Sequence, residues 1–183
     1  GNTEGGTGQV AGPHKGVVRG KDGSNREVTA EHVIVATGAR SRSLPGIDFD
    51  GLKVISSREA MTLAKLPKSM AIIGAGAIGC EFADFYSAMG TKIDIIEVMD
   101  HLLPIEDEDC SILLERSFAK RGIGVHTKSK VEKVEKTASG VKLTVSGPKG
   151  TSVIEAEVCL QAVGVTGNVE GLFGPGAPAE LFK

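Results

Sequence analysis

The stretch that decides the fold runs from Ala71 to Ala83 and reads AIIGAGAIGCEFA. Its pattern is that of an apolar strand, a glycine turn and the start of an amphipathic helix. Gly74, Gly76 and Gly79 form G-x-G-x-x-G, which holds a dinucleotide pyrophosphate when a strand precedes it and a helix follows. The first glycine permits the tight turn, the second lets the backbone approach a phosphate, and the third lets the helix pack closely on the strand. The N–H groups and the positive end of that helix are then expected to face the phosphates.

An acidic residue stands where such a site needs one. Glu97 lies near the end of the next predicted strand, TKIDIIEV, and follows Gly76 by 21 positions, close to the spacing of about 20 at which an acid meets the ribose. Its carboxylate can accept both hydroxyl protons of an adenosine ribose and would repel a 2′-phosphate. The four residues that follow, VMDH, include no arginine to hold such a phosphate. The sequence therefore predicts NAD rather than NADP.

Glu81 has two interpretations. It is either a carboxylate in the first turn of the helix, complementing the dipole, or a group near the nicotinamide that helps to position it. The four histidines, His14, His32, His101 and His126, have no spacing that indicates a catalytic group or a metal site.

Composition narrows the function further. The 183 residues are 40% apolar and 24% charged with a net charge of −2, which makes nucleic acid or an anionic membrane surface an improbable partner. No apolar stretch is long enough to span a bilayer. Cys80, Cys110 and Cys159 form no C-x-x-C pair and are predicted to be reduced thiols of a cytoplasmic protein, two of them in apolar surroundings.

The remaining pattern predicts an α/β fold, with a parallel sheet and crossover helices joined to a three-stranded antiparallel meander. Short strands are expected before residue 31, then a buried strand HVIVATGA and a linker RSRSLPGIDFDGLK. Ser56 and Glu59 predict a capping box. The expected helices are one whose apolar face holds Phe82, Phe85, Tyr86 and Met89, ending at Gly90, and one from Asp107 to Gly122 with Leu113, Leu114 and Phe118 inside. The expected meander strands are KVEKVEK, VKLTV and TSVIEAEVCLQAVG.

Three segments together resemble a known family: VIVATGARSRSLPGI, LPKSMAIIGAGAIGCEFADFYSAMGTKIDIIEVMDHLLP and LQAVGVTGNVEGL. They are similar to the dihydrolipoamide dehydrogenase family of the flavin disulfide reductases. The resemblance implies a Rossmann-like, three-layer FAD/NAD(P)-binding fold in which an FAD domain is interrupted by an NAD domain. It implies that residues 1–44 close the first FAD segment, that 45–170 form the NAD domain, and that 171–183 begin the return linker.

The resemblance also implies the site residues. Gly8, Thr37 and Gly38 resemble positions that touch FAD, Val131 resembles the wall of the adenine pocket, and Gly164 lies beside the nicotinamide half. Glu81 resembles the acid that pairs with a lysine next to the flavin. The implied NAD residues are Gly74, Ala75, Gly76, Ala77, Ile78, Gly79, Glu81, Glu97, Val131 and Gly164.

Such an enzyme passes electrons from dihydrolipoyl groups of 2-oxo acid dehydrogenase complexes through a redox disulfide and FAD to NAD, as a homodimer. This chain has no C-x-x-x-x-C, no FAD fingerprint and no C-terminal His–Glu pair, and it reads GVTGN where many relatives have G-R-x-P-N. We therefore expect a piece that binds NAD(H), holds no flavin and has no catalytic residue. Another flavin disulfide reductase, of the mercuric reductase or NADH oxidase type, and a non-catalytic nucleotide-sensing domain are the alternatives.

Overall fold

A computed structural model describes residues 3–175 and residue 177. The described residues divide into two compact units, one formed by residues 3–40 with 167–175 and 177, and the other by residues 41–166. Most of the expected return linker, residue 176 and residues 178–183, lies outside the described residues. Strands β4 (Ala39–Ser41) and β13 (Val165–Gly167) pair in a two-stranded sheet.

The smaller unit contains an antiparallel sheet of β1 (Thr7–Gly12), β2 (Lys15–Arg19) and β3 (Asn25–Thr29). These strands confirm the short strands expected before residue 31. The prediction of a buried strand at HVIVATGA is wrong, because residues 32–38 form no strand and Ile34 is 91% exposed. An apolar strand needs neighbours for its backbone groups and a covering layer for its side chains. The described part of the chain supplies neither at this place.

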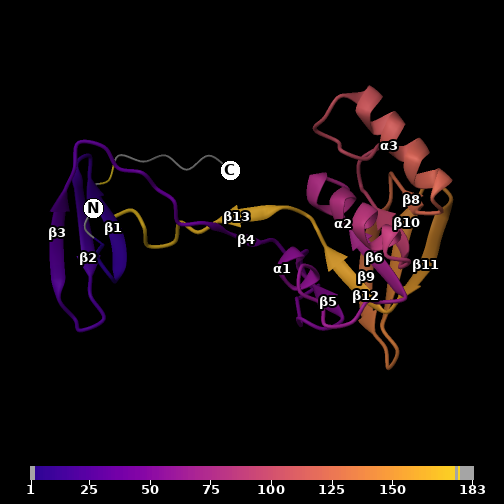
Figure 1. The fold of residues 1–183 in the computed structure, drawn as a ribbon, viewed down its shortest axis with the longest axis horizontal. Helices are drawn as coiled ribbons and strands as arrows, with labels where there is room; N and C mark the ends of the chain where they lie inside the picture. The colour runs from indigo at the N-terminus through magenta and orange to yellow at the C-terminus, as the bar shows by residue number, and fades with distance from the viewer. Residues whose placement is uncertain (1–2, 176, 178–183) are drawn as a thin grey trace. The chain divides into compact units, whose positions relative to one another are not determined.

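The larger unit is built on a five-stranded parallel sheet, which confirms the predicted α/β class (Figure 1). The strand order places β12 and β7 on either side of β6, the strand that leads into the glycine turn. The strands, in sheet order, are β5 (Val54–Ile55), β12 (Val158–Gln161), β6 (Ser69–Ile73), β7 (Lys92–Ile96) and β8 (Gly124–His126).

The sheet carries a different layer on each face because side chains alternate along its strands. Met70 and Ile72 of β6 pack in the core formed with the helices, whereas Ala71 and Ile73 pack against the meander. The helices are α1 (Ser57–Ala60), α2 (Ala77–Ala88) and α3 (Glu108–Lys120), and the antiparallel meander is β9 (Lys130–Lys136), β10 (Val141–Gly147) and β11 (Gly150–Ala156).

The predicted helix ends are confirmed. Ser56 and Glu59 form the capping box of α1, and the side chain of Asp107 caps α3. Gly90 and Gly122 both take positive φ just beyond the helices that they follow.

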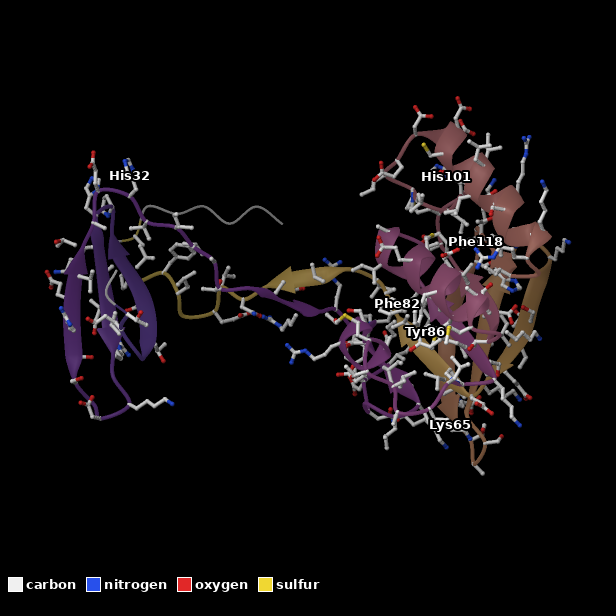
Figure 2. All side chains as sticks on the ribbon, viewed as in Figure 1. His32, Lys65, Phe82, Tyr86, His101 and Phe118 are labelled. Carbon is white, nitrogen blue, oxygen red and sulfur yellow. The ribbon has the colours of Figure 1, made fainter. Side chains whose placement is uncertain are left out.

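The predicted apolar face of α2 is wrong in part. Its buried residues are Gly79, Cys80, Ala83 and Tyr86, whereas Phe85 and Met89 are more than half exposed. Small side chains face the sheet because the helix lies close to it at the glycine turn. Figure 2 labels Phe82 and Tyr86 on this helix, together with Phe118 of α3. Leu113 of α3, also expected inside, is exposed, while Phe118 is buried as predicted.

The last expected meander strand divides in two. Its first part is β11, but residues from Val158 leave the meander and enter the parallel sheet as β12, between β5 and β6. The residues of β12 after Val158 are buried, in contrast to the exposed segment HVIVATGA. Among the described residues, no helix is long and apolar enough to cross a membrane.

Candidate functional site

The glycine loop between β6 and α2 is packed closely against its neighbours at two of its glycines. Gly74 has φ +98°, and a Cβ added there would lie 2.6 Å from the carbonyl oxygen of Ala162. A side chain would therefore be strained and would also clash. Gly79 brings the helix against the loop, since its Cβ would lie 1.9 Å from the carbonyl oxygen of Gly74. Both glycines serve close backbone packing.

Gly76 differs from these two glycines. It is the N-cap of α2 with ordinary φ of −70°, and a Cβ added there would meet nothing within 4 Å. The hydrogen bond from Cys80 N–H to the carbonyl oxygen of Gly76 is 3.0 Å long and is the first of the helix. The N–H groups of Ala77, Ile78 and Gly79 precede it and have no partner within the helix. Open space therefore adjoins a helix N-terminus, which is the geometry that accepts a phosphate.

Glu97 links the end of β7 to this loop. Its side chain is buried, with 7% exposed, and Oε2 accepts the N–H of Ala75 at 2.7 Å while Oε1 accepts the N–H of Met99 at 2.9 Å. Each carboxylate oxygen has two lone pairs, so capacity for further donors remains on both. The carboxylate therefore orders the loop and still presents acceptor groups to the adjoining space.

One cleft of about 790 Å³ joins these features, a volume within the range of about 300–1,000 Å³ usual for cofactor sites. It lies wholly within the larger unit, at the carboxyl ends of the parallel strands, where open α/β sheets bind ligands. The predicted residues that line it are Gly74, Gly76, Ala77, Ile78, Glu97, Val131 and Gly164. Residues far apart in sequence are thus brought together in one cavity.

The other predicted NAD residues lie outside the lining. Ala75 and Gly79 are buried behind the loop surface. Glu81 is exposed, and it lies beyond the first turn of α2, which contains no acidic residue. The prediction that Glu81 lies in the first turn of α2 is wrong, because the helix begins at Ala77 and Glu81 is its fifth residue. The helix dipole acts mainly on the first turn, so this position weakens the interpretation of Glu81 as a dipole partner.

The three predicted FAD residues lie in the smaller unit. Gly8 is in β1 and pairs with Val18 of β2. Thr37 Oγ1 donates to the carbonyl oxygen of Asn168 at 2.6 Å, and the N–H of Asn168 donates to the carbonyl oxygen of Gly38 at 3.0 Å. None of the three lines the 790 Å³ cleft.

Part of the cleft lining was not predicted from the sequence. Leu44, Pro45 and Ile47, from the predicted linker, form one of its walls, and Ser129, Lys130 and Glu132 lie beside Val131. Lys130 and Glu132 form a 2.9 Å ion pair, and Glu132 also accepts the hydroxyl of Ser146 at 2.7 Å. No local pattern predicts the first group, since its position depends on the tertiary path of the linker. Period-2 alternation in KVEKVEK places Lys130 and Glu132 on one face of β9.

The cysteines behave as expected. All three are free thiols, with Cys80 and Cys159 buried and Cys110 exposed. Burial raises the pKa of Cys80 to about 11 and that of Cys159 to about 12, so both are inert thiols at neutral pH. In the described part of the chain, no three His, Cys, Asp or Glu side chains are grouped to hold a metal ion.

Comparison with known proteins places this geometry in a family context. The family model of the pyridine nucleotide-disulphide oxidoreductases matches residues 4–181. A dihydrolipoyl dehydrogenase of Chlorobaculum tepidum is 46% identical over 153 residues, which are 82% of this chain and 32% of that protein. An NAD(P)H dehydrogenase (quinone) of Mycobacterium tuberculosis is 35% identical over 151 residues, 82% of this chain and 30% of that protein.

A solved structure has the same fold. The crystal structure of LpdA from Mycobacterium tuberculosis superposes with a TM-score of 0.78 and 34% identity, over 91% of this chain and 37% of that one. The chain thus spans about a third of the length of the curated relatives that it matches.

Proposed function

The chain belongs to the pyridine nucleotide-disulphide oxidoreductase family, and from that premise we propose that its 790 Å³ cleft binds NAD(H). The observation that carries the proposal is the joint lining of one cleft by a helix N-terminus and a buried carboxylate. The N–H groups of Ala77 and Ile78 fit a pyrophosphate, and the open space over Gly76 lets it approach. Glu97 fits the hydroxyls of a ribose.

The same residues favour NAD over NADP. A 2′-phosphate beside Glu97 would place a second negative charge next to the carboxylate of Glu97, which is already buried and poorly solvated. Lys130, the cation of the cleft lining, is paired with Glu132. The lining therefore carries two carboxylates and one ammonium group, a net negative charge that disfavours an additional phosphate.

The whole protein is proposed to be a dihydrolipoyl dehydrogenase of the cytoplasm, since relatives with that name reach 43–47% identity. It would reoxidise dihydrolipoyl groups of 2-oxo acid dehydrogenase complexes as a homodimer. NAD supplies the hydride acceptor of such chemistry when it is bound. The residues of this chain contribute binding and orientation, which lower a barrier by removing the entropy cost of bringing reactants together. We propose that residues 1–44 and 171–183 belong to the FAD domain and 45–170 to the NAD domain.

We propose that FAD is held in the whole protein with the help of Gly8, Thr37 and Gly38. Thr37 and Gly38 are already hydrogen-bonded to Asn168, and none of the three lines the described cleft. No step is therefore assigned to these residues. The proposal for the 183-residue chain is nucleotide binding without turnover.

NADH titration tests this function. The chain contains no tryptophan, so the fluorescence of the bound dihydronicotinamide is free of tryptophan overlap. We expect NADH to bind and NADPH to bind more weakly. Equal affinities, or no saturable binding, would contradict the assignment of the cleft. Formation of NADH by the purified chain from NAD and dihydrolipoamide would contradict the absence of turnover.

A further inference from the structure

Gln161 is a buried polar residue at the end of β12, with only 1% of it exposed. Both the oxygen and the nitrogen of its side-chain amide form hydrogen bonds. Oε1 accepts the N–H of Leu44 at 2.8 Å, and Nε2 donates to the carbonyl oxygen of Ile47 at 2.7 Å. A buried amide is unfavourable unless such partners are present, so its position is fixed by the segment that it binds.

That segment is a wall of the cleft. Leu44, Pro45 and Ile47 line it together with the residues that follow Gln161 in sequence, Ala162 to Gly164. A further hydrogen bond of 3.0 Å, from the N–H of Arg42 to the carbonyl oxygen of Gly164, joins the two stretches. The wall has no strand or helix of its own at these positions, so these hydrogen bonds set its backbone position, together with the packing of Ile47 and Leu44 against the core under the meander.

The strand order shows which half of a dinucleotide this wall faces. Glu97 follows β7, on one side of β6, whereas Gln161 ends β12, on the other side. A dinucleotide with its pyrophosphate at the N-terminus of α2 and its adenosine ribose at Glu97 extends its other half toward β12. The wall formed by Leu44 and Pro45 would therefore lie beside the nicotinamide of a dinucleotide bound in this way.

We propose that Gln161 is a positioning residue that holds the Leu44–Ile47 wall against the nicotinamide, and so sets affinity for the intact dinucleotide. The inference rests on the proposed NAD(H) site. It goes further than that site in assigning a function to a buried amide that touches no ligand itself.

Two ligands and two variants test this assignment by calorimetry. NADH carries the nicotinamide, whereas ADP-ribose has the same adenosine, pyrophosphate and second ribose without it. Gln161→Met keeps the side-chain volume and removes both hydrogen bonds. We expect it to weaken NADH binding about five- to tenfold and to change ADP-ribose binding less than about twofold, because the wall is displaced only beside the nicotinamide.

Thr91→Val is the matched control. Thr91 is also buried, and its hydroxyl donates to the carbonyl oxygen of Pro67 at 2.7 Å, at the opposite end of β7 from Glu97. This variant loses a buried hydrogen bond of the same unit without touching the cleft, so both ligands should keep their affinities. Equal weakening of NADH and ADP-ribose by Gln161→Met, or no weakening of either, would overturn the assignment.

The unmodified chain gives an independent measurement if Gln161→Met does not fold. Hydrogen exchange at the Leu44 amide should slow further on adding NADH but not on adding ADP-ribose. Equal slowing by both ligands, or by neither, would contradict the role of the wall. An unmodified chain that binds neither ligand would instead refute the nucleotide site itself.

Discussion

The carboxylate of Glu97 accepts the backbone N–H of Ala75 at a distance of 2.7 Å. The acid proposed to recognise the ribose is therefore also a structural partner of the loop proposed to hold the phosphates. Ala75 is fully buried, so the side chain cannot turn away without leaving a buried donor unpaired; its second oxygen also accepts the N–H of Met99. Ligand selectivity and loop order are coupled through one side chain.

This coupling predicts that Glu97→Gln changes two properties together. An amide has one acceptor oxygen where the carboxylate has two, so either Ala75 or Met99 loses its partner. We expect the free energy of unfolding to fall by about 1–3 kcal/mol. The ratio of NADPH to NADH dissociation constants should fall as well, because the negative charge is removed. Chemical denaturation and fluorescence titration measure the two effects.

The charge argument predicts a larger change of selectivity for Glu97→Arg, which should narrow or reverse the preference for NADH. An unchanged ratio in both variants would show that Glu97 does not contact the ribose. Glu157→Gln provides a control, since Glu157 also accepts a backbone N–H, that of Lys68, but does not line the cleft. Its ratio of affinities should match that of the unmodified chain.

Substitution by alanine should affect stability and NADH binding differently at two glycines of the loop. Gly76→Ala adds a methyl group where no atom lies within 4 Å, at an ordinary φ of −70°. The loss of a favoured N-cap glycine and the lower entropy of the unfolded chain act in opposite directions, so the free energy of unfolding should change by less than about 1 kcal/mol. Binding of NADH should fall at least about tenfold, because the methyl group occupies the space where a phosphate approaches.

Gly79→Ala should mainly lower the stability of the fold. Its added Cβ would lie 1.9 Å from the carbonyl oxygen of Gly74, a backbone atom that cannot move without displacing the loop. We expect a loss of about 1–3 kcal/mol or more in unfolding free energy. Thermal unfolding without ligand separates the two variants, and equal stability of both would contradict the described packing.

The buried thiols predict an alkaline loss of stability. Burial raises the pKa of Cys80 to about 11 and of Cys159 to about 12, above the usual range of a free thiol near 8.5 to 9. Above pH 9 the unfolded chain releases these protons while the folded chain keeps them. The unfolding free energy therefore falls as pH rises from about 9 toward 11.

Replacing both residues by alanine should flatten that slope, although the absolute stability falls. Denaturation at several pH values between 8 and 10.5 measures the slope. The exposed Cys110 offers a control, since Cys110→Ala should leave it unchanged. A slope that is the same in all variants would assign the alkaline effect to other groups, such as Tyr86, whose pKa burial also raises.

Local patterns predicted much of the larger unit. The glycine turn, Glu97 and the capping box of α1 each depend on residues whose spacing fixes their geometry. The face of α2 was mispredicted because periodicity alone does not distinguish Phe85 from Ala83 as the side that packs closely. The wall formed by Leu44 and Pro45 could not be predicted, since it is created by hydrogen bonds to Gln161, over a hundred residues away.

The strand expected at residues 32–38 failed for a different reason. Its composition is that of a buried strand, but strand formation depends on pairing partners as well as on composition. In the described part of the chain no strand pairs with these residues, and Val33, Ile34 and Val35 are all exposed. An apolar segment in that state is an aggregation hazard.

Ile34→Asp should therefore raise the solubility of the chain without changing its stability. The side chain is 91% exposed, so its replacement removes almost no buried area, and the free energy of unfolding should change by less than about 0.5 kcal/mol. Ile72→Ala provides the contrast, because Ile72 is fully buried between the sheet and the helices. This substitution should lower the free energy of unfolding by about 2–5 kcal/mol. Light scattering against concentration measures the first effect, and denaturation measures the second. If Ile34→Asp destabilised the chain as much as a core substitution, the segment would be packed in solution, and the predicted strand would exist after all.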